Sequence, residues 1–421
     1  MKKLLSLVLA LAMSIGVCSM FTACGDGTKP LIALIALHDT NSTYDKNFIE
    51  AFEAACEENG LSKNDYLLYT NVPEKTDCKE KALDAADRGC EVVFSDSFGH
   101  EPYMLEAAKE TTGTHFASAT GNKAHTSNLS NFHNAFASIY EGRYLAGVAA
   151  GLKLKEMIDA KTVTADTDGN YKLGYVGAYT YAEVISGYTS WFLGVQSVVP
   201  NVKMDVKFTG SWYDEQKEAD AARALINGGC VLLSQHADSM GAPSACELKG
   251  VPNVSYNGST ASACPNTFII SSRINWQPYF SYLIKAAKDL REGKTATIDT
   301  DWMGTIDNNA VVLTECGQAA AEGTQAKLDE VKAKLVNGEI KVFDTSKFTV
   351  TVKLGEEGKN VHATVDENGH LTSYMADVNF DAEYTPDTEV VANGEFQESK
   401  FRSAPYFDVQ IDGITRLNSA F

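Results

Sequence analysis

The chain lacks the short motifs that mark the common nucleotide-dependent and metal-dependent enzymes. No GxGxxG or GxxxxGKS phosphate loop is present, and there is no GxSxG nucleophile elbow. The eight histidines show no HExxH or HxH spacing, and no two cysteines form a CxxC pair, so we expect no metal site. These absences predict a protein without a cofactor and without catalytic residues.

Basic residues and long apolar runs are also scarce. The 36 lysines and arginines are outnumbered by 55 acidic residues, which gives a formal net charge of -19. Such a surface would repel phosphate backbones, so we expect no nucleic-acid partner. Outside the N-terminal segment, no apolar run of the sequence is long enough to span a bilayer.

The nine cysteines do not suggest a disulfide framework. Without Cys18 and Cys24 in the N-terminal segment seven remain, and an odd number leaves at least one thiol unpaired or in an intermolecular bond. Cys246 and Cys264 either bridge a loop or remain free. The other five are Cys56, Cys78, Cys90, Cys230 and Cys316.

The N-terminal residues have the layout of an export signal. Two lysines precede an apolar run over 4–13, which is too short to cross a membrane. The sequence TACG at 22–25 is similar to a bacterial lipobox, where cleavage leaves an acylated cysteine. We therefore expect a signal peptide over 1–23 and a lipid on Cys24, which would anchor the protein to the extracytoplasmic face of the cell membrane. The alternative is an ordinary secretory signal that is cleaved elsewhere.

From residue 31 onward, short apolar strands alternate with amphipathic helices. The run at 31–37 predicts a strand, and the helix predicted over 45–59 places Phe48 and Phe52 on one stripe. Strands and helices continue to alternate as far as 115–119. This βαβ series predicts a parallel, doubly wound sheet.

The same series begins again after a helical block at 138–157, with strands from 172–177 to 267–271. The repetition predicts two similar doubly wound α/β lobes that face one cleft. We expect the chain to cross between them three times, which would form a hinge. The predicted boundaries are a lobe I over 24–136 plus 273–302 and a lobe II over 137–272 plus 303–338.

The last part of the chain, 339–421, has a different character. The segments 348–354 and 361–375 alternate like strands, and Asn368-Gly369 marks a hairpin turn. We expect a β-rich C-terminal extension, either a flap on lobe II or a separate interaction module.

The loops that follow the predicted strands supply the candidate ligand site. In open parallel sheets ligands bind beyond the carboxyl ends of the strands. These loops contain aromatic rings beside neutral or acidic hydrogen-bonding groups and few basic residues, which suits a planar, uncharged ligand rich in heteroatoms. From this pattern we predict ligand contacts for Tyr44, Ser97, Phe98, Thr120, Tyr181, Trp212, Gln235, His236, Asp238 and Asn257.

Two other interpretations of these residues stay open. The aromatic residues Tyr44, Phe98 and Trp212 could be packing residues. His236 and Asp238 could act with a serine as a hydrolase, although no order of catalytic residues can be assigned.

The stretch NFHNAFASIYEGRYLAGVAAG at 131–151 resembles the signature of the basic membrane protein (BMP) family of substrate-binding lipoproteins. The segments HFASATG, SQHADS and INWQPYF agree with it in order, so the resemblance extends from about residue 31 to about residue 338. It implies the type I periplasmic-binding-protein fold and delivery of the ligand to an ABC importer. It also implies a purine nucleoside or purine base as ligand.

The resemblance also implies roles for individual residues. Tyr44 and Trp212 match the family's stacking aromatics on the two faces of the base. Asp45 matches an acidic position after the first aromatic, Ser97, Phe98 and Gly99 match the loop after the third strand, and Asn275 and Trp276 match the second hinge crossing. An expected lysine near that crossing is absent, where Ile274 stands beside Arg273, and Thr120-Gly121 replaces an expected Asp-Gly. These departures leave open whether ribose is recognised.

Together these observations predict a monomeric, lipid-anchored solute-binding protein of an ABC importer that captures a purine and passes it to the permease. A ligand-sensing lipoprotein that signals to a membrane partner would use the same cleft. A nucleoside hydrolase is a further alternative.

Overall fold

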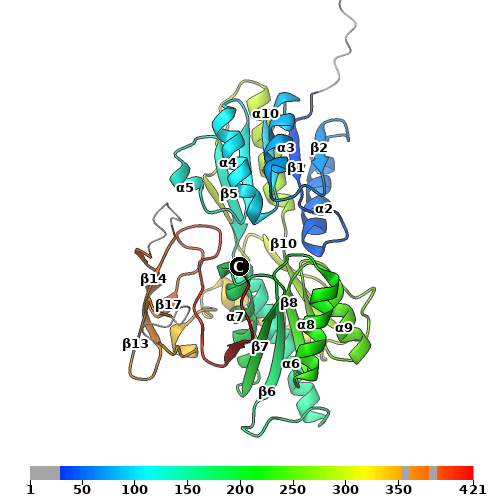
Figure 1. Cartoon of the computed structure of the whole chain (residues 1–421), viewed down its shortest axis with the longest axis vertical. Helices are drawn as coiled ribbons and strands as arrows, with labels where there is room; N and C mark the ends of the chain where they lie inside the picture. Colours follow the sequence, from blue (N-terminus) through cyan, green and yellow to red (C-terminus); the bar gives the residue numbers. More distant parts are fainter. Residues whose placement is uncertain (1–28, 353–359, 379–385, 421) are drawn as a thin grey trace, which may run out of the picture.

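The computed structural model describes residues 29–352, 360–378 and 386–420. The predicted signal peptide and the predicted lipid site at Cys24 lie outside these residues. The described chain forms two lobes, one above the other, with most of the extension beside lobe II (Figure 1). The two parallel sheets confirm the predicted fold class.

Lobe I is built on a parallel sheet of six strands in the order β11-β5-β4-β3-β1-β2. Its central strands are apolar on both faces. Leu34 and Phe94 face the core beneath α2 and α10, whereas Ala33 and Val93 face the core beneath α3 and α4. The elements are β1 (Ile32–Ile35), α2 (Thr43–Glu58), β2 (Tyr66–Tyr69), α3 (Thr76–Asp87), β3 (Val92–Ser95), η1 (Phe98–His100), α4 (Glu101–Glu110), β4 (His115–Ala119), α5 (Ala124–Ser127), β5 (Phe132–Ala137), α10 (Gln277–Arg291) and β11 (Asp301–Gly304).

Lobe II has a sheet of seven strands in the order β12-β10-β9-β8-β6-β7-β18, in which only the β10–β12 pairing is antiparallel. Helices α6 and α7 pack tightly on one face. A Cβ atom on Gly147 would lie 2.1 Å from the carbonyl oxygen of Trp191, so only glycine permits this approach. The elements are α6 (Ile139–Asp159), β6 (Tyr171–Gly177), α7 (Ala182–Gln196), β7 (Val202–Phe208), α8 (Glu215–Asn227), β8 (Leu232–His236), α9 (Gly241–Lys249), β9 (Asn253–Tyr256), β10 (Phe268–Ile274), β12 (Val311–Leu313) and α11 (Thr324–Val336).

The chain passes between the lobes at three places, after β5, after β10 and after β11. At the first and third places β5 and β11 run side by side, with Asn134 opposite Asp301. Three short connections allow two rigid bodies to rotate about them with few backbone changes.

The C-terminal extension differs from its prediction in one strand. No strand forms at 348–352, the described part of the predicted strand at 348–354, whereas the hairpin about Asn368-Gly369 is present. The last strand, β18 (Ile414–Arg416), joins the lobe II sheet beside β7. The extension is therefore partly built into lobe II. Its other elements are η2 (Thr345–Lys347), β13 (Ala363–Val365), β14 (Leu371–Ala376), β15 (Thr388–Glu389), β16 (Val391–Ala392) and β17 (Glu395–Phe396).

Three further features concern compartment and chemistry. All seven cysteines from Cys56 to Cys316 are free thiols, and these include Cys246 and Cys264. The described part of the chain contains no group of three residues that could hold a metal ion. None of its helices combines the length and the apolar character that a membrane span requires.

Candidate functional site

A cavity lies between the two lobes, where the carboxyl ends of their strands meet. The space among its lining atoms, open solvent included, is about 320 Å³. Both lobes contribute to its wall. The lining residues are Leu37, Tyr44, Ser97, Phe98 and Thr120 from lobe I, and Glu183, Trp212, His236 and Asp238 from lobe II.

The lobes touch around this cavity, so the structure is a closed form. The backbone N–H of Thr43 donates to the carbonyl oxygen of Asp238 at 2.9 Å. The rings of Phe98 and Tyr181 approach across the cleft, with centroids 5.7 Å apart. These contacts join the loops that carry the lining residues.

Tyr44 lies in the first turn of α2 and is fixed from two sides. Its hydroxyl donates to the carbonyl oxygen of Asp96 at 2.7 Å, and its ring packs on Phe48 with centroids 4.9 Å apart. The ring face is therefore held at the cavity wall without support from a ligand.

Asp45 does not line the cavity, although the sequence predicts a ligand contact there. Its carboxylate accepts hydrogen bonds from the backbone N–H of His38 at 2.7 Å and from the Ser42 hydroxyl at 2.6 Å. Burial alone would raise the pKa of Asp45, but the hydrogen bonds from His38 and Ser42 outweigh it and lower the pKa. The side chain shapes the loop before α2.

The loop after β3 is held in a similar way. Glu74 accepts from the Ser97 hydroxyl at 2.6 Å and from the backbone N–H of Gly99 at 3.0 Å. Ser97 and Phe98 reach the cavity wall, but Gly99 does not. A Cβ at Gly99 would lie 2.3 Å from the Glu74 carboxyl carbon, so the glycine makes room for this anchor.

Lobe II supplies a group of aromatic rings, which we call the aromatic wall: Tyr179, Tyr181 and Trp212. Tyr179 stacks on Tyr181 at 5.2 Å, and its ring meets Trp212 edge to face at 5.0 Å. Only Trp212 of the three lines the cavity, and the Tyr181 ring lies beside it, with centroids 6.2 Å apart. An aromatic side chain that packs against other rings keeps its ring face in one orientation.

The polar groups of the cavity are acidic or neutral. Among the lining residues there is no lysine or arginine. Within the described residues no group donates a hydrogen bond to the Asp238 side chain, and burial, followed by the charges of Asp45, Glu218 and Glu183, raises the pKa of Asp238 well above its usual value. A buried carboxyl group in this state gains from a ligand that brings hydrogen-bond donors.

His236 is paired with Glu183 and not with a serine. Its Nε2 lies 3.4 Å from Glu183 Oε1, and burial lowers the pKa of His236. No serine is hydrogen-bonded to His236 in the part of the chain that the structure describes. The arrangement thus lacks the nucleophile and base contact that a hydrolase of this type needs.

Four other predicted residues also lie away from the cavity. Trp276 is 1% exposed and stacks on Phe48 in the lobe I core, with centroids 4.4 Å apart. The Gln235 side chain accepts from Asn253 at 2.9 Å inside lobe II. Asn257 and Asn275 line a different opening. For Trp276 and Gln235, local contacts that the loop pattern does not reveal set the direction of the side chain.

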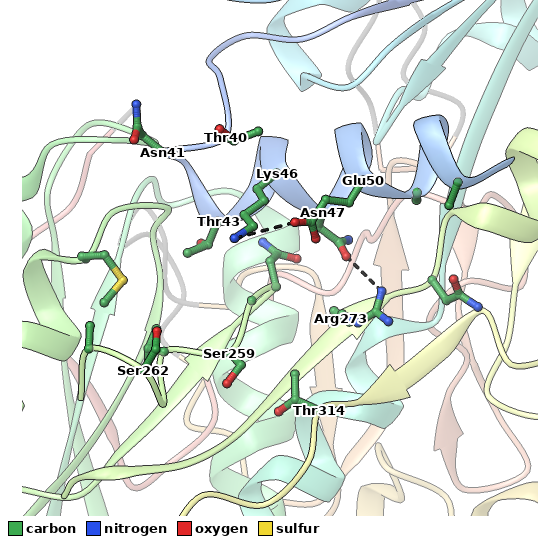
Figure 2. A pocket seen from close by; sticks show the side chains of 18 of the residues that line it. Thr40, Asn41, Thr43, Lys46, Asn47, Glu50, Ser259, Ser262, Arg273 and Thr314 are labelled. Atoms are coloured by element: carbon green, nitrogen blue, oxygen red, sulfur yellow. Dashed lines mark hydrogen bonds and ion pairs between the residues drawn. The ribbon is translucent and has the colours of Figure 1, made fainter. Parts of the chain in front are cut away.

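That opening is a polar groove between α2 and the hinge side of lobe II. Figure 2 shows Lys46, Asn47 and Glu50 on the helix above Arg273. The Arg273 guanidinium donates to the Asn47 side chain at 3.2 Å, so it lies in this groove and leaves the cavity without a basic group.

Sequence reasoning missed two lining residues, Leu37 and Glu183. Glu183 lies in the loop segment 177–183, which follows the predicted strand at 172–177, and this position was the available signal. Leu37 ends the apolar run of the first strand, and an apolar residue at a strand end does not stand out from the core residues before it.

Comparison with known proteins shows the family of the chain. The family model Bmp, described as ABC transporter substrate-binding protein PnrA-like, matches residues 32–346. A purine-binding protein of Brucella abortus is 30% identical over 68% of this chain and 76% of its own length. A putative ABC transporter glucose-binding protein of Haloferax volcanii is 26% identical over 66% of each chain. An ABC transporter nucleoside-binding protein of Lactococcus lactis is 25% identical over 51% of this chain and 57% of its own.

Solved structures support the fold. An ABC transporter solute-binding protein from Aeropyrum pernix matches with a TM-score of 0.59 and 17% identity, over 75% of this chain and 93% of its own. At this identity the likeness concerns the fold alone, and the fold is the type I periplasmic-binding-protein fold.

Proposed function

Because the chain belongs to the Bmp family of PnrA-like ABC transporter substrate-binding proteins, we propose that it captures a purine base or purine nucleoside between its lobes and delivers it to the permease of an ABC importer. The observation that carries the proposal is the cavity itself, in which Tyr44 and Phe98 of lobe I and Trp212 of lobe II line one small space. Aromatic rings contributed from both lobes suit a flat heterocycle, because stacking on each face provides affinity.

The acidic groups support a ligand that presents hydrogen-bond donors. Asp238 and Glu183 can accept from the ring N–H and amino groups of a purine or from ribose hydroxyls. A phosphorylated ligand would bring its charge next to these carboxyl groups with no basic residue in the lining to compensate. We therefore propose a neutral base or nucleoside and not a nucleotide.

Ligand binding would be coupled to closure of the hinge. Rings and polar groups from both lobes surround the ligand together only in the closed form, so a ligand shifts the population toward that form. The bond from Thr43 to Asp238 and the contact of Phe98 with Tyr181 then help to hold the lobes together. The permease would recognise this closed form and release the ligand by opening it.

The location follows from the same proposal. We propose that Cys24 is acylated after removal of residues 1–23, so that the protein works as a monomer on the extracytoplasmic face of the cell membrane. Labelling cells with a fatty-acid analogue and comparing the full chain with Cys24→Ser tests this step. Loss of label in the variant supports it, and equal label in both contradicts it.

The substrate is tested by calorimetric titration of the purified protein with adenine, guanine, adenosine, guanosine, glucose and an amino acid mixture. A ligand that binds only the folded state also raises the melting temperature, which gives a second measurement. The proposal expects a response to at least one purine and none to glucose. A response to glucose alone, the ligand named for the Haloferax relative, would overturn the purine assignment.

A further inference from the structure

We propose that the last described residues, 417–420 (the C-terminal tail), hold the lobe II loops that bear the aromatic wall in their ligand-binding position. The inference rests on the proposed function, because it assumes that these loops receive the ligand. The tail lies beyond the residues that match the family model, so it is a feature of this chain outside the shared region. Figure 1 places the C-terminus at the junction of the two lobes.

The tail begins from a fixed strand. β18 pairs in parallel with β7, with Ile414 opposite Met204 and Arg416 opposite Val206. The Arg416 guanidinium donates to the hydroxyl of Tyr188 in α7 at 2.8 Å. The strand therefore delivers the next residues to the carboxyl end of the sheet, which is the end at the cavity.

Asn418 continues the strand pairing with its side chain. The backbone N–H of Phe208 donates to Asn418 Oδ1 at 2.8 Å, and Asn418 Nδ2 donates to the Phe208 carbonyl oxygen at 2.9 Å. Phe208 is the last residue of β7, four positions before Trp212. The loop that carries Trp212 thus leaves the sheet from a residue that the tail clamps.

Ala420 makes a second reciprocal pair, this time with the other loop. The N–H of Thr180 donates to the Ala420 carbonyl oxygen at 2.8 Å, and the N–H of Ala420 donates to the Thr180 hydroxyl at 2.9 Å. Thr180 stands between Tyr179 and Tyr181, and three positions before Glu183. Two pairs of hydrogen bonds therefore fix both loops from one short segment.

This arrangement predicts an effect on affinity that exceeds its effect on stability. Loops that are ordered before the ligand arrives lose less conformational entropy on binding, so releasing them weakens the complex. The tail residues Leu417 to Ser419 are exposed and Ala420 packs partly buried against the core, so shortening the chain uncovers little apolar surface. Asn418 and Thr180 act as positioning residues, because neither lines the cavity.

The test compares Asn418→Ala, a chain that ends at Leu417, Thr180→Val and Thr180→Ser with the unaltered chain. The probe is the tightest-binding of adenine, guanine, adenosine and guanosine. We expect the affinity to fall about threefold in Asn418→Ala and about tenfold in the shortened chain and in Thr180→Val. Thr180→Ser keeps the hydroxyl and should bind as tightly as the unaltered chain. In all four variants the melting temperature without ligand should stay within about 2 °C of the unaltered value.

Asn360 offers a matched control. Asn360 is joined to the backbone of Gln410 by the same reciprocal amide pair, at 2.8 Å in both directions, but before β18 and not after it. Because Asn360 has a positive φ of 53°, the control is Asn360→Gly. Unchanged affinity in the shortened chain, or an equal loss in Asn360→Gly, would overturn the proposal.

Hydrogen exchange separates a failure of this inference from a failure of the proposed function. In the ligand-free shortened chain, peptides covering 178–183 and 209–214 should exchange faster than in the full chain, and peptides covering 38–45 of lobe I should not change. If no purine binds even the unaltered chain, the proposed function fails and this measurement alone decides the inference. Equal exchange at 178–183 in both chains would overturn it.

Discussion

The two lobes share one architecture but use their acidic residues differently. In lobe I several acids next to the cleft accept from the backbone, although Asp96, which accepts from the N–H of Leu37, has no partner for its second oxygen among the described residues. Glu74 accepts from Gly99, and Asp45 accepts from His38. Glu101 accepts from the N–H groups of Asn122 and Lys123 at 2.8 Å each.

In lobe II, two acids at the corresponding strand ends remain on the cavity side. Asp238 receives no hydrogen bond on its side chain from the described residues, and Glu183 meets only the ring of His236. Other acids of this lobe support loops in the manner of lobe I: Glu218 accepts from the N–H groups of Asp214 and Ser239, and Glu247 accepts from the N–H of Asn266.

The two lobes therefore use their acidic residues for different purposes. Lobe I forms a wall whose loops are fixed by its own carboxylates, whereas lobe II presents carboxyl groups to the ligand and leaves part of its loop support to the C-terminal tail. A carboxylate that accepts several backbone N–H bonds stabilises the fold, and one that is buried without donors costs stability until a ligand arrives. Substitutions in the two lobes should therefore separate affinity from stability.

The largest loss of affinity is expected for Asp238→Ala. Removing the acceptor leaves ligand donors unpaired in a buried site, which costs about 1–3 kcal/mol, so binding should weaken up to roughly 100-fold. The backbone carbonyl that accepts from Thr43 remains. Calorimetry measures the affinity, and thermal unfolding of the ligand-free protein should show equal or greater stability. If the variant is destabilised but binds with full affinity, Asp238 supports a loop and does not contact the ligand.

Trp212→Ala should have the next largest effect. Base stacking on an aromatic ring contributes about 1–3 kcal/mol, so we expect the affinity to fall roughly 30-fold. Trp212→Phe keeps a ring face and serves as the control, with a loss of about threefold. Fluorescence or calorimetric titration provides the measurement. If alanine and phenylalanine variants bind alike, the ring does not stack on the ligand.

Glu101→Ala in lobe I should give the opposite result. Its carboxylate holds two backbone N–H groups and the Asn134 side chain, so we expect the free energy of unfolding to fall by about 2 kcal/mol. The folded variant should bind within about twofold of the unaltered chain, because Glu101 does not line the cavity. Urea unfolding and titration measure the two quantities. Loss of affinity with unchanged stability would show that Glu101 contributes to binding, as the lobe II acids do, and not to the support of lobe I.

Much of the fold could be predicted from the sequence, because its signals are local. Apolar runs at 31–37 and 91–95 mark strands that are buried on both faces, and the carboxyl ends of such strands must gather at one edge. From this rule alone Tyr44, Phe98 and Trp212 are expected at one cleft, and all three line the same cavity. The alternation of strands and helices likewise predicts the two parallel sheets, and Asn368-Gly369 predicts the hairpin that forms there.

The remaining features depend on the direction of single side chains and on contacts between distant segments. Asp45 turns away because Ser42 and His38 offer donors nearby, and Trp276 turns inward because Phe48 lies on the adjacent helix. The pairing of β18 with β7 joins residues more than 200 positions apart, and its three residues have no pattern of their own. Such pairings follow from the assembled surface and not from the local sequence.

The smallest effect is a pH dependence of stability that leaves binding unchanged. Glu398 of the extension is buried against Ser186 of α7, and burial raises its pKa to about 7. The folded chain therefore keeps this proton up to about pH 7 while the unfolded chain releases it near its ordinary value of 4.5, so the free energy of unfolding falls as pH rises between these values. In Glu398→Gln this fall should be smaller, and its melting temperature should exceed that of the unaltered chain by more at pH 8 than at pH 5. The exposed Glu322 provides the control, because Glu322→Gln should follow the unaltered chain at both values. Parallel pH profiles for the unaltered chain and Glu398→Gln would show that the Glu398 carboxyl group is not held protonated at the junction of extension and lobe II.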